Sequence, residues 1–239
     1  MFHPIRSLVA LAVIVGLLVG ADRVAAHAAE GRIAQAVQSA ADLPSRPTVH
    51  VHGFPFVTQA IRGTYDHIEV TANDIFDRAD AGRGSVTTVN FEGVHIPASK
   101  ALSGKVHEIR VDHVTGQVKV AFADIEAAAH LPGVTVRAIA GHDDEVSIDE
   151  AISFAGATVN ASAIASVALA GNTLTLKVVD VQVAGGITVP ASVLAGLRTH
   201  ASFSVKIPGL PAGVKLTAVV VSPDGVIAAL QATALTLTR

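Results

Sequence analysis

Short runs of alternating hydrophobic and polar residues make up most of this chain. In 49–52 two valines alternate with two histidines, and in 68–72 Ile, Val and Ala alternate with Glu and Thr. Alternation with a period of two is typical of a strand with one buried face, because successive side chains point to opposite sides. We therefore predict a strand over each of these runs.

The residues between these strands predict a short helix, preceded by an apolar segment at residues 53–56 that we call the elbow. Residues 53–56 read Gly-Phe-Pro-Phe, so an aromatic side chain stands on each side of Pro55. Proline fixes φ and has no backbone N–H, which suits the first turn of a helix, where that donor has no intrahelical partner. A helix is therefore predicted over 56–61, and Gly63 is placed to end it.

The middle of the chain predicts two further features of the strands. Gly93 shifts the alternation that begins at Ser85, and a glycine at such a phase change is typical of a β-bulge. Two alternating runs, 106–114 and 118–122, are separated by a Thr-Gly pair at 115–116. We therefore predict a hairpin with its turn at this pair.

The remaining elements follow from the same signals of period, glycine and proline. The second half of the chain reads as an almost continuous meander of strands, with turns at 142–144, 171–172 and 222–225. Helices are predicted over 24–43, 97–102, 124–130 and 190–197, and strands over 134–140, 146–154, 157–169, 174–183, 203–207, 214–221 and 226–237.

The N-terminus predicts export. A positive charge precedes an uncharged apolar run, 8–21, which fits the core of a signal peptide and falls short of the roughly 20 residues that cross a membrane. The alanines of Ala26-His27-Ala28 offer a small-residue cleavage pattern, whereas a helical pattern that continues past Val24 favours an uncleaved membrane anchor. Both alternatives place the protein in the periplasm or the cell envelope. We assign 1–29 to this segment and 30–239 to one α+β domain, because 45–239 contains no linker-like gap.

Composition and charge narrow the possible functions. Half of the residues are hydrophobic, only 15% are charged, and the mean hydropathy is +0.51. This surplus of apolar residues predicts either an internal cavity or contact with a membrane or a partner. The formal net charge of −3 provides no basic surface for nucleic acid. The absence of cysteine excludes disulfide bonds, thiolate zinc sites and thiol catalysis.

The sequence shows no catalytic constellation. It contains no Gly-x-Ser-x-Gly elbow, no phosphate-binding loop and no dinucleotide-binding fingerprint. His50 and His52 share one face of a predicted strand and could supply two ligands to a metal, but solvent-facing strand histidines are the commoner case. The acidic run 142–145 lacks the ligand spacing of a calcium loop and predicts a polar hairpin tip. We therefore predict a protein that is not an enzyme and that uses no metal and no cofactor.

Motifs spread over the chain carry a resemblance to a known family. They are Gly53-Phe54-Pro55-Phe56-Val57-Thr58-Gln59, Gly63-Thr64-Tyr65-Asp66, the strand end Val70-Thr71-Ala72, Val111-Asp112-His113-Val114-Thr115-Gly116, Ile207-Pro208-Gly209-Leu210-Pro211 and Ser222-Pro223-Asp224-Gly225. Together they resemble the LmeA-like phospholipid-binding family of bacterial cell envelopes, which is similar to the tubular lipid-binding superfamily. The resemblance covers nearly the whole chain after the N-terminal segment.

This resemblance implies both a fold and a function. The implied fold is α+β, with a strongly curved antiparallel β-sheet wrapped around a long N-terminal helix, short helices between strands, and an enclosed apolar tunnel. The implied function is phospholipid binding at the membrane surface, with lipid transfer, inositol-containing lipids and a supporting role in envelope glycolipid assembly as narrower possibilities. The implied partners are phospholipid and membrane, with no nucleic acid.

The candidate lipid-binding residues are mostly aromatic and lie on different predicted elements. The elbow aromatics flank Pro55 at a strand end, where a cavity mouth or a membrane-contact tip would lie, and two polar residues of the next helix could meet the headgroup. Acyl chains gain about 0.8 kcal/mol per buried methylene and need few directional contacts. The predicted site residues are Phe54, Pro55, Phe56, Gln59, Arg62, Phe91, Phe122 and Phe154.

Two alternatives make different predictions. A structural or scaffolding β protein of the envelope would have a solid core and would carry no lipid. A metal-assisted enzyme built on His50 and His52 would hold stoichiometric metal and would lose activity when either histidine is replaced.

Overall fold

The structure is a computed structural model, and its described residues form two compact units. The first unit is Met1–Thr71, Val89–Val114 and Thr233–Arg239, and the second is Ala72–Thr88 and Thr115–Ala232. The single domain predicted over 30–239 stays a prediction. The described residues are 3–41, 43–73, 86–103, 108–129, 133–154, 157–183, 202–206 and 212–238.

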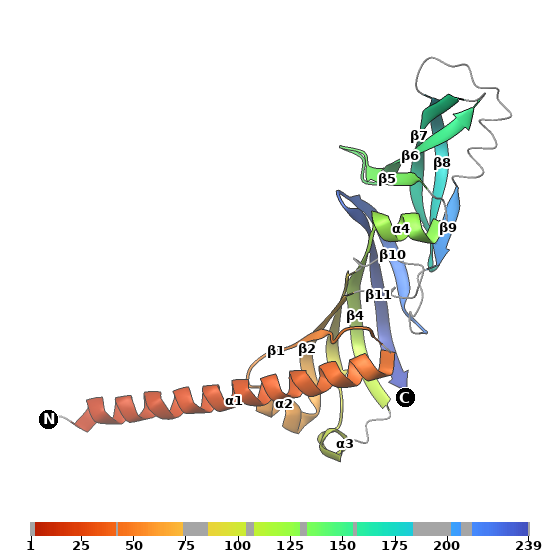
Figure 1. Ribbon diagram of the computed structural model, residues 1–239. Coiled ribbons are helices and arrows are strands. Elements are labelled where there is room, and N and C mark those ends of the chain that lie inside the picture. Colours follow the sequence, from red (N-terminus) through yellow and green to blue (C-terminus); the bar gives the residue numbers. More distant parts are fainter. Residues whose placement is uncertain are drawn as a thin grey trace. The chain divides into compact units, whose positions relative to one another are not determined.

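The described chain is mostly antiparallel sheet, with a long N-terminal helix and short helices elsewhere (Figure 1). One sheet has the strand order β1-β2-β3-β4-β11-β10 and the other β5-β6-β7-β8-β9, and neither closes on itself. The coarse α+β prediction is therefore confirmed, whereas the wrapped helix and the tunnel stay predictions. The helices are α1 (His3–Ala41), α2 (Phe56–Arg62), α3 (Ala98–Ser103) and α4 (Phe122–Ala129). The strands are β1 (Thr48–His52), β2 (Thr64–Asn73), β3 (Val86–His95), β4 (Glu108–Ala121), β5 (Val134–Ala138), β6 (Glu145–Phe154), β7 (Ala157–Ala170), β8 (Thr173–Val183), β9 (Phe203–Lys206), β10 (Lys215–Ser222) and β11 (Gly225–Thr238).

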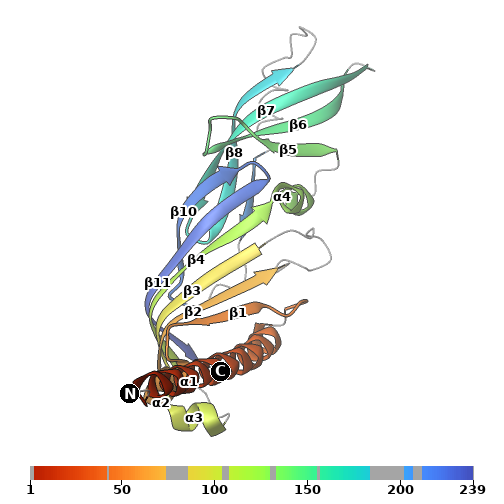
Figure 2. The ribbon, with the colours of Figure 1, turned by 90° about the vertical axis from the view of Figure 1, so that its left-hand side faces the viewer.

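In the first unit, α1 packs against β1 and α2. β1 lies beside β2 (Figure 2) and pairs with it in the register Val49↔Val70 and Val51↔Ile68, so these four residues share one face of the ladder. Val49, Val51 and Ile68 are buried, whereas the alternate residues His50 and His52 are exposed. The two strands predicted from alternation are therefore confirmed, with the valines inward as the pattern indicates.

The helix predicted over 24–43 is only the second half of α1, which begins at His3. The residues before Val24 are rich in Leu, Val and Ala and contain no proline after Pro4, so nothing breaks the helix there. Among the described residues, no helix combines the length and the apolarity that crossing a membrane requires.

The hairpin predicted at 115–116 is wrong. β4 runs through these residues without a turn and lies between β3 and β11 in the sheet. Val114, Val118 and Val120 are all buried, so the period-two pattern continues across Gly116 on a single face. Pairing with a strand on each side keeps the Thr-Gly pair extended, which the local sequence alone could not indicate.

Gly93 has the unusual backbone that its position predicts. Its φ is +63° inside β3, in the left-handed region that favours glycine. A Cβ atom at Gly93 would also overlap the carboxylate of Asp112 on β4. Both observations fit the predicted β-bulge.

The second unit contains the predicted meander. β5 to β9 pair in sequence order, all antiparallel, and the turns at 142–144, 171–172 and 222–225 are confirmed. The backbone N–H groups of Val167 and Val221 donate to the carbonyl oxygens of Asp144 and Asp143, at 2.8 and 2.6 Å. The tip after β5 therefore links β7 and β10. The helix predicted over 190–197 lies outside the described residues.

A glutamate on a helix covers one edge strand in each unit. β1 and β5 are each the first strand of their sheets, so one side of their backbone has no strand partner among the described residues. The Val51 N–H donates to Glu30 Oε1 of α1 at 2.9 Å, and the Val136 N–H donates to Glu126 Oε1 of α4 at 2.6 Å. An uncovered edge strand can pair with another chain, so both carboxylates protect the sheets from association.

This arrangement predicts that Glu126→Ala destabilises the protein. The Val136 N–H would lose its acceptor at a partly buried position, and we expect a loss of about 1–2 kcal/mol in the free energy of unfolding. Urea unfolding measures this loss, and Glu126→Gln, which keeps a side-chain oxygen, should retain most of the stability. Equal stability of the alanine variant and the original protein would contradict the role of this bond.

Candidate functional site

The predicted elbow and short helix are present in the first unit. The Phe54–Pro55 peptide bond is cis, and Pro55 is the N-cap residue of α2 without contributing a side-chain hydrogen bond. α2 ends at Gly63, whose φ of +70° is left-handed and whose N–H donates to the Gln59 carbonyl. The helix predicted over 56–61 is therefore confirmed to within one residue.

A side chain from α1 caps the N-terminus of α2. Asp22 Oδ2 accepts from the Phe56 N–H at 3.0 Å, and Asp22 Oδ1 accepts from the Val57 N–H at 2.9 Å. The first N–H groups of a helix have no partner within it, and a proline cannot supply one from its side chain. Asp22 is only 4% exposed, so α1 provides the acceptor in place of a local capping residue.

Arg23 joins the same contact to the elbow. Its Nη2 donates to Asp22 Oδ2 at 2.6 Å and to the Gly53 carbonyl at 3.0 Å. Burial raises the pKa of Asp22, but the hydrogen bonds from Val57, Arg23 and Phe56 outweigh burial and hold this pKa below its ordinary value. Asp22 is therefore a carboxylate at neutral pH, with its charge balanced inside the contact.

Three large apolar side chains of this region are exposed. Phe54 is 60% exposed, Val57 44% and Ile61 74%; we call these residues the elbow face. Val57 and Ile61 are four residues apart and so lie on one side of α2. Phe56, in contrast, is buried against Tyr65, with ring centroids 6.1 Å apart, and burial raises the pKa of the Tyr65 phenol.

The polar candidates of the elbow differ in exposure. Gln59 is buried; its Nε2 donates to the His52 carbonyl at 3.2 Å and its Oε1 accepts from the Asp66 N–H at 2.8 Å. This amide group therefore ties the end of β1 to β2 beneath the elbow. Arg62, in contrast, is exposed in the last turn of α2. A second arginine, Arg23, has its guanidinium carbon 5.5 Å from the centre of the Phe54 ring.

The structure brings together only part of the predicted site. Phe54, Pro55, Phe56, Gln59 and Arg62 form the elbow and α2. The other predicted residues lie on separate elements: Phe91 is half-buried on β3 of the same unit, Phe122 is buried at the start of α4 in the second unit, and Phe154 ends β6 in the second unit with its side chain outside the described ones. Sequence reasoning missed Val57, Ile61, Asp22 and Arg23; the four-residue spacing of the first two was the available signal.

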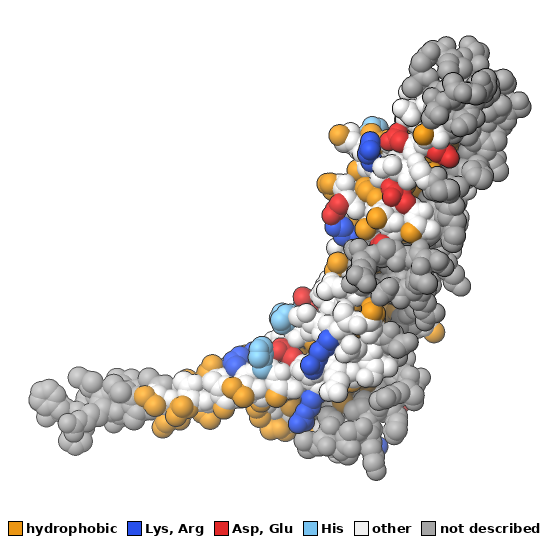
Figure 3. Space-filling view, viewed as in Figure 1, with side chains coloured by type: hydrophobic (Ala, Val, Ile, Leu, Met, Phe, Trp, Pro, Cys, Tyr) orange, Lys and Arg blue, Asp and Glu red, His pale blue; other side chains and the backbone are white. Residues whose placement is uncertain are grey.

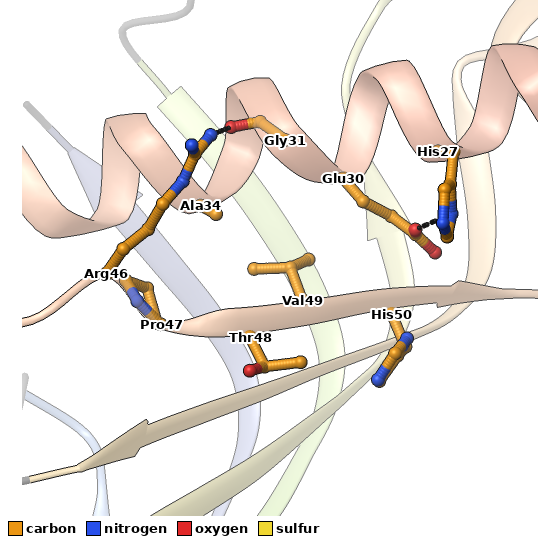
Figure 4. A pocket seen from close by; sticks show the side chains of 9 residues that line it. All are labelled: His27, Glu30, Gly31, Ala34, Arg46, Pro47, Thr48, Val49 and His50. Atoms are coloured by element: carbon orange, nitrogen blue, oxygen red, sulfur yellow. Dashed lines mark hydrogen bonds and ion pairs between the residues drawn. The ribbon is translucent and has the colours of Figure 1, made fainter.

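An open hollow of about 280 Å³ lies beside this region, between α1 and the start of β1. Figure 4 shows Val49 pointing between the two elements, whereas Thr48 and His50 lie on the other side of the strand. The hollow's charged groups are engaged: Arg46 donates to the Gly31 carbonyl, and His27 Nδ1 lies 2.7 Å from Glu30 Oε2. None of the predicted site residues lines this hollow, whose lining is His27, Glu30, Gly31, Ala34, Arg46, Pro47, Thr48, Val49 and His50.

The strand histidines make contacts with one another. The rings of His52 and His67 are stacked with centroids 4.5 Å apart, and the His50 ring lies 6.3 Å from that of His52. A ring nitrogen of His67 is 2.9 Å from Asn90 Oδ1. Within the part of the chain that the structure describes, no three His, Asp or Glu side chains are placed to hold a metal ion.

Comparison with known protein families shows to which family the chain is similar. A family model described as LmeA-like phospholipid-binding matches residues 20–231, which is nearly the whole chain. The resemblance carried by the sequence motifs is thereby confirmed. No curated protein and no solved structure matches the chain.

Proposed function

Because the chain belongs to the LmeA-like phospholipid-binding family, we propose that it binds a phospholipid at the elbow, with the acyl chains against the elbow face. The observation that carries this proposal is the exposure of Val57 and Ile61 on one side of α2, whose N-terminus Asp22 caps, together with the exposure of Phe54 just before this helix. Full burial of such a side chain contributes roughly 1.5–3 kcal/mol, and covering the exposed part of each of these three contributes a share of that free energy. Acyl chains supply this cover without requiring polar partners.

The elbow also offers groups for a phosphate. Arg62 is exposed at the end of α2, and Arg23 keeps further N–H donors beyond those that bind Asp22 and the Gly53 carbonyl. A guanidinium group presents five donors in a plane, a geometry that suits phosphate oxygens. We assign the headgroup to these arginines, while Gln59 acts by holding the elbow in place.

The proposal also covers where in the cell the protein resides and which class of lipid it binds. The apolar run 8–21 supports an exported protein that remains in the cell envelope, either anchored or released. The resemblance supports an acyl-chain tunnel between sheet and helix, inositol-containing lipids, lipid transfer and a role in glycolipid assembly. Identification of the lipids that co-purify with the full chain tests the lipid class directly.

A photoactivatable phospholipid with a diazirine on its acyl chain tests the elbow. Irradiation of the full chain with this lipid should place the adduct on the peptide that contains the elbow face, as read by mass spectrometry after digestion. Val57→Asp should reduce the adduct about tenfold, because a charge would replace an apolar contact.

Val220→Asp is the matched control, since Val220 lies on β10 and is 44% exposed, like Val57. The control should label as strongly as the original protein. Equal loss in both variants, or an adduct spread evenly over the chain, would contradict a lipid site at the elbow. A protein that takes up no phospholipid at all would favour the scaffolding alternative.

A further inference from the structure

We propose that α1 and the elbow face dock together on a phospholipid bilayer, with the apolar stretch of α1 in the hydrocarbon and the elbow face at the boundary with the headgroups. This inference deepens the proposed function, because it uses the same elbow. It joins to the elbow a second element, residues 13–19 of α1, which lie within the apolar run 8–21, and it places both elements at one membrane surface.

The apolar stretch of α1 is exposed around the whole helix. Its large side chains within 13–19 are between 38% and 68% exposed, and Figure 3 shows hydrophobic side chains along the visible face of this part of α1. Seven consecutive residues cover almost two helical turns, so they include every side of the helix. A groove in a protein covers one stripe of a helix, whereas hydrocarbon covers all sides. The bilayer is therefore the occupant that fits this stretch. The exposed residues are Val13, Ile14, Val15, Leu17, Leu18 and Val19.

The end of this stretch is fixed to the elbow. Asp22 and Arg23 lie three and four residues after Val19 on α1, and they form the hydrogen bonds with Phe56, Val57 and Gly53. All of these residues belong to the first unit. The elbow face is therefore held at the level where the apolar stretch of α1 ends.

The charges at this level also fit the boundary of a membrane. The carboxylate of Asp22 is buried and paired with Arg23, so it presents no charge outward. Val24, the next residue of α1, is again apolar and 71% exposed. Arg62 lies in the last turn of α2. There its guanidinium group can reach lipid phosphates while the apolar side chains of the elbow face enter the bilayer beneath the headgroups.

Single-cysteine labelling tests the docking, since the chain contains no cysteine. Full-length L18C, I61C and V220C, each carrying an environment-sensitive fluorophore, are mixed with vesicles of equimolar phosphatidylcholine and phosphatidylglycerol. We expect a blue shift at positions 18 and 61 and none at position 220. Lipids spin-labelled deep in the acyl chain should quench position 18 more strongly than position 61.

A second variant tests the contribution of the elbow face to binding. Ile61→Asp should weaken vesicle partitioning about tenfold, whereas Val220→Asp should leave it unchanged. A shift at position 18 without any at position 61 would overturn the joint docking. A shift at position 18 without vesicles, together with cross-linking between Leu18 positions of two chains, would show that a second copy covers α1 and would also overturn it.

The two proposals fail separately. Loss of the diazirine adduct from a dispersed phospholipid, with the vesicle-induced shifts retained, would remove the lipid site and leave the docking. The reverse result would remove the docking and leave the lipid site.

Discussion

Replacing Asp22 by alanine is expected to detach the elbow from α1 and to lower the Tm by roughly 4 °C or more. The substitution removes the acceptor for two backbone N–H groups at the start of α2, and a helix as short as Phe56–Arg62 has few other bonds. It also leaves Arg23 without its carboxylate partner. Thermal unfolding followed by circular dichroism measures the loss, and adduct formation with the diazirine lipid should fall in parallel.

The pH dependence of stability gives an independent readout of the same contact. The pKa of Asp22 is lowered in the folded protein. The stabilisation that the ionised carboxylate adds to the free energy of unfolding is therefore fully present above the ordinary pKa of 3.8, and it is lost as the pH falls through the lower pKa of the folded state. Asp22→Asn cannot titrate and keeps one acceptor oxygen. At neutral pH we expect the stability of Asp22→Asn to lie between that of the original protein and that of Asp22→Ala. In acid, Asp22→Asn should not show the loss of stability that protonation of Asp22 causes. An alanine variant as stable as the original protein would show that α2 needs no cap.

A chain that begins at Glu30 is expected to lose the fold of the first unit. The truncation removes Asp22 and Arg23, whose hydrogen bonds hold the elbow. It also removes Ala26, a residue of α1 that is only 3% exposed. Circular dichroism and urea unfolding should show a shallow, non-cooperative transition for this part of the protein. The expected effect is larger than that of Asp22→Ala, because packing is lost together with the cap.

A chain that begins at Gly20 is the control, since it keeps Asp22, Arg23 and Ala26. It should unfold cooperatively, with a Tm close to that of the full chain. If the chain from Glu30 were equally stable, the contacts of Asp22 and Ala26 would be dispensable and a domain boundary at residue 29 would be supported.

Local signals predicted the elements around the elbow well. The alternation in 49–52, the proline at position 55 and Gly63 each restrict the backbone within a few residues, and β1 and α2 are found where these signals indicate. The same signals failed at 115–116, where Thr-Gly favours a turn but two neighbouring strands keep β4 extended. Glycine permits a turn; it does not impose one against a ladder of hydrogen bonds on both sides.

The sequence by itself determined the family, the antiparallel character of the second half and the elbow with its aromatic residues. Only the tertiary structure decided which of the aromatic side chains of the elbow is exposed to solvent. Phe54 and Phe56 are alike in sequence, yet one is exposed and the other is buried against Tyr65, because capping by Asp22 fixes the orientation of α2. Asp22 lies 34 residues from Phe56 along the chain, and no local pattern connects them. A contact between side chains that distant depends on how α1 packs, and packing is a property of the folded chain as a whole.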